Sequence, residues 1–331
     1  MLLLNTDPGQ LAFNSPDGRT NFAVADIIAC LKFLRTVLPS FAGDVSKITI
    51  AGQSSGANLI RALLATPSAA PLFQSAILHS DPMVSLHLRT KFLVAEIPQD
   101  YGFLSTTVQS KLQQYFNEQI GCSAKNTLCI SSLTLSAILS AQNALYNNGV
   151  SIDPSATQEE PMRPVHDGVL ITSTLDSSSP FPHVSKPIIL STVKDEAGPA
   201  IYSSMTTPID ASTYAAIVCS AFEEPEASNL LAYPGYQVPT LTGGQNADAR
   251  IQLEGMGTDQ VWRCPTWTFA RSWTQHGGSA FVAQYTVGAT YPDNADIPFC
   301  CEAGSVCHED DIEIVVRDLI GFCVSIINDK V

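Results

Sequence analysis

The sequence predicts an α/β fold in which a mostly parallel central sheet is flanked by helices. Residues 47–51 (KITIA) alternate in character and are rich in β-branched side chains, as in a buried strand. The apolar run at residues 57–64 is typical of a helix, and residues 75–79 (SAILH) are typical of a second strand. A strand, a helix and another strand in this order form a βαβ unit, in which the two strands run parallel.

The rest of the chain extends this pattern. We expect two further strands and two further helices, the strands at residues 187–193 and 280–287 and the helices at 24–38 and 259–274. Residues from about 100 to 185 are helical and loop-rich, so we expect a cap-like insertion over the sheet. A chain of 331 residues, 45% of them hydrophobic, can form one large domain, and we expect residues 1–331 to be a single domain.

The charge balance excludes one class of partner. Lys and Arg total 17 and Asp and Glu total 31, which gives a net charge of -14. This charge repels phosphate backbones and anionic membrane surfaces, so we expect no nucleic-acid partner. No apolar run reaches the roughly 18 residues of a membrane-spanning helix. The apolar run after Met1 is short and has no basic leader, so we expect no signal peptide within this chain.

The nine cysteines point towards an oxidising compartment. Cys122 and Cys129 lie close together, and Cys300, Cys301 and Cys307 form a second cluster. This spacing predicts disulfide-closed loops with at least one cysteine left over. Because secreted enzymes use disulfides and cytosolic enzymes mostly do not, the cysteines favour secretion.

The segment Gly52-Gln53-Ser54-Ser55-Gly56 has the form of a nucleophile elbow. In such a turn between a strand and a helix, the serine lies on a strained backbone that lifts its Oγ above the sheet, and the glycines permit close backbone approach. We expect Ser54 to be the nucleophile and the backbone N–H of Ser55 to donate to an oxyanion. A Gly-Ser loop without chemistry is the alternative, but the strand before this motif and the helix after it favour the elbow.

A serine nucleophile needs a histidine as its base and a carboxylate that orients the histidine. In folds with this elbow the chain order is serine, acid, histidine, and only His276 and His308 lie late enough. The other histidines are His79, His87, His166 and His183. We favour His308, because a disulfide between Cys301 and Cys307 would fix its loop. His276 precedes two glycines and is interpreted as a solvent-facing residue at a helix end.

The acid is expected at Asp195-Glu196, where a strand ends, because catalytic groups on α/β sheets lie at the carboxyl ends of strands. The pattern alone does not separate these two residues. The cysteine cluster with His308 can also be interpreted as a metal site, but its spacing fits no zinc motif, so we expect no metal.

Several blocks in the same order resemble the type-B carboxylesterase/lipase family, and most closely its fungal members. These blocks are Asn21 to Ile50, Gly52 to Ala57, Phe73 to Ile77, Gly121 to Cys129, Pro164 to Gly168, Lys194 to Gly198 and Val306 to His308. The resemblance implies an α/β-hydrolase fold and hydrolysis of small-molecule or lipid carboxylic esters through an acyl-enzyme, without a cofactor. It also implies a triad of Ser54, Glu196 and His308, a disulfide between Cys122 and Cys129, and secretion of the parent enzyme.

The sequence departs from the family in two ways. The Gly-rich loop that supplies two oxyanion donors is missing before Ser54, and the loss of one such donor costs roughly 2.7–4 kcal/mol of transition-state stabilisation. The first strands of the sheet are expected to be missing too, so the chain is interpreted as truncated at both ends. Val84 to Gln99 and the tail after Val315 look foreign, and we interpret them as translated introns. The alternative function is therefore a catalytically impaired fragment or a non-catalytic binding protein. The sequence predicts neither the ester nor the oligomeric state.

Overall fold

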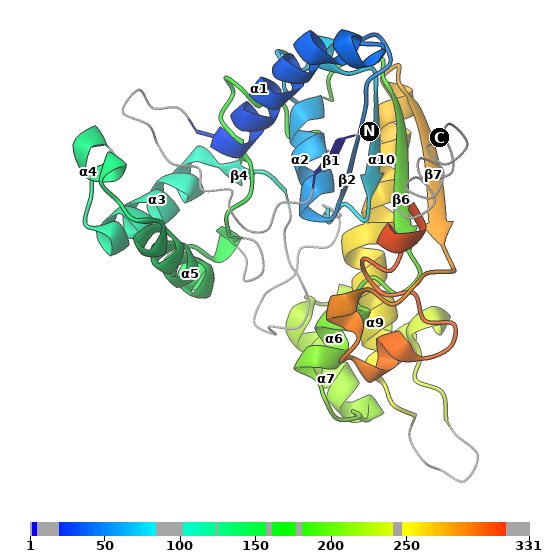
Figure 1. Ribbon diagram of the computed structural model, residues 1–331. Helices are drawn as coiled ribbons and strands as arrows, with labels where there is room; N and C mark the ends of the chain where they lie inside the picture. Colours follow the sequence, from blue (N-terminus) through cyan, green and yellow to red (C-terminus); the bar gives the residue numbers. More distant parts are fainter. Residues whose placement is uncertain are drawn as a thin grey trace. The chain divides into compact units, whose positions relative to one another are not determined.

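The computed structural model describes residues 2–4, 20–83, 102–123, 125–156, 161–176, 181–240 and 247–315 (Figure 1). The described residues divide into two compact units. The first unit comprises those up to residue 83, those from 102 to 189, and 269–281. The second unit comprises those from 190 to 268 and from 282 to 315. The expectation of a single domain stays a prediction.

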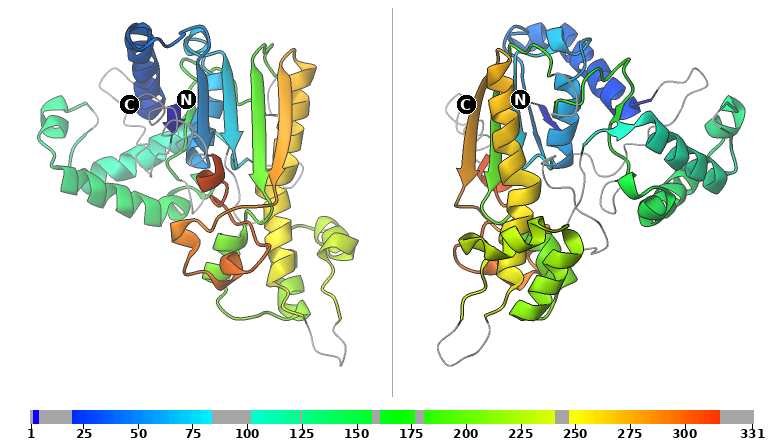
Figure 2. Two further views of the ribbon diagram at one scale, coloured as in Figure 1. Left: turned by 45° about the vertical axis from the view of Figure 1, so that its right-hand side comes forward. Right: turned by 180° about the vertical axis from the view of Figure 1, so that it is seen from behind.

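In the described part of the chain, the larger sheet has five strands in the order β1-β2-β3-β6-β7 (Figure 2). Their bounds are Leu2–Leu4 for β1, Thr49–Gln53 for β2, Ser75–His79 for β3, Pro187–Val193 for β6 and Ser279–Tyr285 for β7. The strands β1, β2 and β3 are parallel, with Thr49 opposite Ser75. The expected α/β fold with a parallel sheet is confirmed. The first strands of the sheet were expected to be missing, but in the structure β1 pairs with β2.

Two helices near the start of the first unit bury apolar side chains. Helix α1 (Phe22–Val37) buries Val24, Ile27, Ile28 and Leu31, which recur at helical spacing. A 3₁₀ turn with Pro39 follows it, η1 (Leu38–Phe41). Helix α2 (Ser55–Leu64) packs against β2 and β3 and is buried along most of its length.

The described part of residues 100–185 contains α3 (Thr106–Ile120), α4 (Thr127–Ser131) and α5 (Leu135–Ile152). The short strands β4 (Leu104–Ser105) and β5 (Val165–His166) form a second, parallel sheet beside them. Side chains of α3 and α5 share one hydrophobic cluster with Leu104 and Val165. The helical character of this segment matches the sequence analysis, and its role as a cap stays a prediction.

The second unit contains helices that the sequence analysis did not predict. They are α6 (Gly198–Ser204), α7 (Ala211–Ala221), α8 (Glu226–Ala232) and α9 (Arg250–Thr258). A π-helical turn, η5 (Asp259–Arg263), joins α9 to α10 (Cys264–Gln275). Among the described residues, short 3₁₀ turns also occur in the first unit, at η2 (Ala70–Leu72) and η3 (Pro154–Ala156), and in the second unit, at η4 (Pro234–Tyr236), η6 (Pro292–Asn294) and η7 (Pro298–Cys301).

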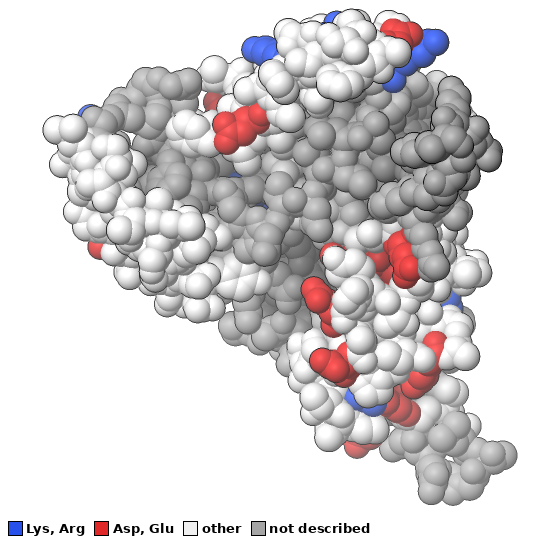
Figure 3. Space-filling model, in the orientation of Figure 1, with Lys and Arg blue, Asp and Glu red and all other residues white. Residues whose placement is uncertain are grey.

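Two surface properties bear on the expected partners. Among the described residues, none of the helices has both the length and the apolar character needed to cross a membrane. On the face seen in Figure 3, acidic side chains gather over the second unit, in line with the net charge of -14. The two stretches interpreted as translated introns lie outside the described residues.

Candidate active site

Ser54 occupies the turn between β2 and α2, with φ 54 and ψ -119. A residue with a Cβ rarely adopts such a positive φ, which costs of order 1–3 kcal/mol. The backbone holds the turn from both sides, because Ser54 N–H donates to His79 O at 2.9 Å and Asn58 N–H donates to Ser54 O at 3.0 Å. The strained strand-to-helix turn expected of an elbow is present at Ser54.

Close backbone packing explains the glycine at position 52. A Cβ added to Gly52 would lie 2.6 Å from both the carbonyl carbon and the oxygen of Gly56. Strand β2 and the first turn of α2 approach too closely at this point for any side chain. Ser55 is the first residue of α2, where backbone N–H groups point out of the helix and carry the positive end of its dipole.

Glu196 and His308 come together in the second unit, although 112 positions separate them. His308 Nδ1–H donates to Glu196 Oε2 at 2.6 Å, and Glu196 Oε1 accepts the N–H of Val193 at 2.8 Å. The Glu196 side chain is fully buried, while the side chain of His308 is 18% exposed. An imidazole whose Nδ1 is held by a buried carboxylate keeps Nε2 free of its proton, and so able to accept another.

The electrostatics around His308 favour its charged form. Burial acts to lower the pKa of His308, but the hydrogen bond and charge of Glu196, with the charges of Glu309 and Asp311, raise the pKa above its ordinary value. Burial first, and then the charge of Glu196, raise the pKa of Asp311 to about 6. The carboxylates therefore stabilise the imidazolium that forms when His308 accepts a proton.

Hydrogen bonds join the loop of Glu196 to the loop of His308. Asp195 N–H donates to Val306 O at 2.9 Å, and Val306 N–H donates to Asp195 Oδ2 at 2.9 Å. Asp195 thus fixes the backbone, whereas its neighbour Glu196 contacts the histidine. A Cβ on Gly198 would lie 2.8 Å from Cys307 Sγ, so the two loops also pack directly on each other.

The disulfide beside His308 corrects the sequence analysis. The pairing expected between Cys301 and Cys307 is wrong, because the structure joins Cys300 to Cys307. Cys300 is 2% exposed and faces the core, whereas Cys301 is an exposed free thiol whose Sγ–H donates to Ala295 O at 3.4 Å. The expected disulfide between Cys122 and Cys129 is present.

Sequence reasoning missed a buried network behind the acid. Thr258 Oγ1–H donates to Glu254 Oε1 at 2.6 Å and accepts the N–H of Ala197 at 3.0 Å. Burial, and less strongly the charges of Asp195 and Glu196, raise the pKa of Glu254 to about 7. A lone Glu in a helix carries no signal for such a role. The ring of Trp262, on the π-helical turn, lies 5.5 Å from the ring of His308.

The structure brings only part of the predicted site together. Ser54 and Ser55 belong to the first unit, and Glu196 and His308 belong to the second. His276, the alternative histidine, follows α10 and is half-buried against Phe181, with ring centroids 4.9 Å apart, and its Nδ1–H donates to Ser272 O at 2.7 Å. It therefore lies at a helix end as expected, and it is half-buried.

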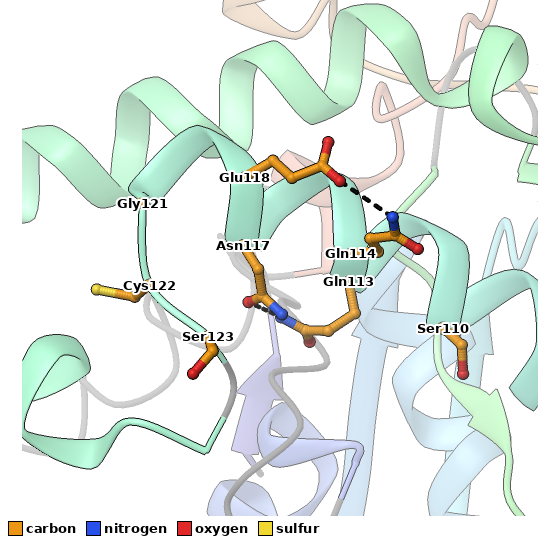
Figure 4. A pocket seen from close by; sticks show the side chains of 8 residues that line it. All are labelled: Ser110, Gln113, Gln114, Asn117, Glu118, Gly121, Cys122 and Ser123. Carbon is orange, nitrogen blue, oxygen red and sulfur yellow. Dashed lines mark hydrogen bonds between the residues drawn. The ribbon is translucent and has the colours of Figure 1, made fainter.

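An open cavity of about 510 Å³ lies along α3 in the first unit (Figure 4). Polar side chains of α3 and the loop from Gly121 to Ser123 line it. Gln113 donates to Asn117 at 2.9 Å and Gln114 donates to Glu118 at 3.0 Å, so these side chains pair along the helix. Neither Ser54 nor Ser55 lines this cavity.

Comparisons with known proteins bear on the fold and the family of the chain. The cAMP-regulated D2 protein of Dictyostelium discoideum is 26% identical over 265 residues, which cover 79% of this chain and 45% of that protein. Para-nitrobenzyl esterase of Bacillus subtilis is 43% identical over 60 residues, which cover 18% of this chain and 12% of that protein. A solved structure of a PNB esterase covers 95% of this chain and 59% of its own, with a TM-score of 0.61 and 18% identity, which supports the α/β-hydrolase fold.

The chain spans less than two thirds of the length of each of these proteins. A model of the carboxylesterase family matches residues 9–322, which is most of the chain. The chain therefore belongs to the carboxylesterase family.

Proposed function

We propose that this protein hydrolyses carboxylic esters through a Ser-Glu-His triad and an acyl-enzyme intermediate. The observation that carries this proposal is the contact of 2.6 Å between His308 Nδ1 and Glu196 Oε2. A strained turn at a serine can have a structural role alone. A histidine oriented by a fully buried carboxylate is the arrangement of a general base. The family model and the esterases among the relatives support the same reaction class.

In the proposed reaction, Ser54 Oγ attacks the ester carbonyl carbon while His308 Nε2 accepts its proton. Glu196 stabilises the resulting imidazolium, and the N–H of Ser55 donates to the oxyanion. His308 then gives its proton to the departing alcohol, which leaves an acyl group on Ser54. Water attacks this acyl group with His308 again as the base, which releases the acid and restores Ser54.

The substrate and the location belong to the same proposal. We propose small-molecule or lipid esters as substrates, as the resemblance implies. The disulfides at Cys122–Cys129 and Cys300–Cys307 support an oxidising compartment and secretion of the parent enzyme. A closest relationship to fungal members stays a prediction.

Labelling by a fluorophosphonate probe tests the proposal. The wild-type protein is expected to be labelled, and the Ser54→Ala variant is expected to lose the label. Ser110→Ala removes an exposed hydroxyl on α3 and serves as the matched control, which keeps the label. An ester panel graded by acyl length then identifies the substrate class. If Ser54 neither takes the label nor supports hydrolysis of any ester, this chain is a non-catalytic member or an impaired fragment.

A further inference from the structure

Asp310 is a buried carboxylate that the proposed reaction does not use. It is 1% exposed and lies two residues after His308. Burying a carboxylate costs folding free energy unless several N–H groups donate to it. The donors to Asp310 therefore show which segments the carboxylate holds in place.

The two oxygens of Asp310 bind different segments. Oδ2 accepts the N–H of Cys307, the residue before His308, at 2.7 Å. Oδ1 accepts the N–H of Tyr291 at 2.8 Å and Asn294 Nδ2–H at 2.9 Å. The carboxylate thus joins the histidine loop to the segment from Tyr291 to Asn294.

Asn294 completes the connection from the other side. Its Nδ2 group also donates to the carbonyl oxygen of His308 at 2.8 Å, and the residue is 3% exposed. Hydrogen bonds therefore fix the backbone on both sides of His308, at the N–H of Cys307 and at the carbonyl of His308. Ala289 N–H donates to Asp310 O at 2.9 Å, and a Cβ on Gly288 would lie 2.9 Å from Asp310 Cβ, so this segment packs directly on Asp310.

We propose that Asp310, acting with Asn294, is a positioning residue for His308. It fixes the peptide groups on either side of the histidine, so that Nδ1 remains on Glu196 and the ring keeps one orientation. The assignment rests on the proposed function only in taking His308 as the base. Misplacement of a catalytic group by about 1 Å costs up to about 100-fold in rate, so the backbone of His308 needs such support.

The test compares Asp310→Asn with Asp167→Asn. Asp310→Asn keeps the shape of the side chain but replaces one carboxylate oxygen with an NH₂ group. This NH₂ group then faces an N–H donor and cannot bond to it. Asp167, in the first unit, is a matched control because its Oδ1 accepts three backbone N–H groups, from Val169, Leu170 and Ile171, at 2.8–3.0 Å. Both variants are expected to lose stability.

The distinguishing readout is the Nδ1 proton of His308 in NMR spectra, assigned by its loss in Glu196→Gln. Asp310→Asn is expected to weaken or shift this signal, to lower the pKa of His308 and to reduce kcat up to about 100-fold with little change in KM. Asp167→Asn is expected to leave the signal and the pKa unchanged. If Asp310→Asn fails to fold, Asn294→Ala removes the donor to both Asp310 and His308 and is expected to act in the same direction.

The proposal is overturned if Asp310→Asn, or Asn294→Ala in its place, loses stability but keeps the Nδ1 signal and the pKa of His308. Absence of ester hydrolysis by the wild-type protein would instead count against the proposed function. The NMR comparison would still decide the role of Asp310 in that case, so the two failures are distinguishable.

Discussion

Glu196 Oε2 lies 2.6 Å from His308 Nδ1, and both oxygens of this carboxylate are engaged, because Oε1 accepts the N–H of Val193 at 2.8 Å. The second contact orients the carboxylate from its own strand, β6. The histidine is thus oriented by a group that is itself held by regular secondary structure. A change at either residue is expected to alter the tautomer of the ring as well as its position.

Glu196→Gln tests the electrostatic part of this contact. The amide can still accept the N–H of Val193, but its NH₂ group faces Nδ1 and favours the wrong tautomer of His308. We expect kcat to fall by about 10⁴. Because Glu196 raises the pKa of His308, its loss lowers that pKa, and the residual activity should begin to rise at a lower pH. A pH–rate profile checks this, with the exposed Glu302→Gln as control, and an unchanged profile for Glu196→Gln would contradict it.

Ser54→Gly tests the strain at the elbow. Glycine adopts φ 54 without steric cost, so we expect this variant to gain about 1 kcal/mol in the free energy of unfolding while it loses hydrolysis. Ser54→Ala also loses the hydroxyl but keeps the Cβ, and so keeps the strain. Urea unfolding of the two variants measures the difference. Equal stabilities would show that the turn stores no strain at this position.

Cys300→Ser and Cys301→Ser test the disulfide. We expect Cys300→Ser to lose roughly 2–3 kcal/mol of stability. The disulfide closes a short loop and therefore removes only a modest amount of conformational entropy from the unfolded chain. Cys301→Ser is expected to keep the stability and the linkage. Peptide mapping without reductant identifies the pairing, and a linkage between Cys301 and Cys307 in the wild-type protein would contradict the structure.

Glu254→Gln tests the buried network behind the acid. Burial raises the pKa of Glu254 to about 7, above the ordinary 4.5 of a glutamate, so the folded state binds its proton more tightly than the unfolded state. The cost of ionising Glu254 is therefore absent below the unfolded pKa and grows as pH rises through about 7. We expect Glu254→Gln to match the wild type near pH 4 and to exceed its stability by up to about 3 kcal/mol near pH 8. Thermal unfolding at both pH values measures this, and the exposed Glu118→Gln should show no such dependence.

Local patterns predicted several strands of the central sheet. The strands at Ser75–His79 and Pro187–Val193 match their predicted bounds, because runs of apolar residues between turns specify buried strands. Helices α6 to α9 were missed, and α6 and α8 have only seven residues each, too few for a clear period. The helix predicted at 259–274 begins in the structure as a π-helical turn that continues α9.

Sequence patterns predicted the contacts of the site less well than the elements of the fold. Cys300 and Cys301 are adjacent, and only the turn of η7 decides which of them faces Cys307. In the same way, Asp195 bonds the backbone of Val306 while Glu196 reaches His308. Which of two adjacent residues makes the contact depends on how distant loops meet in the fold. The order of residues along the chain does not specify this. The resemblance selected Glu196, and the residues alone did not.

Gly198 makes two distant positions of the sequence depend on each other during evolution. A methyl group there would lie 2.8 Å from Cys307 Sγ and 3.0 Å from the ring of Phe299. A side chain at position 198 is therefore tolerable only after the sulfur has been replaced by something smaller, which also removes the disulfide. The two changes are therefore expected to be non-additive, so that Gly198→Ala costs less stability in a variant without the disulfide than in the wild-type protein.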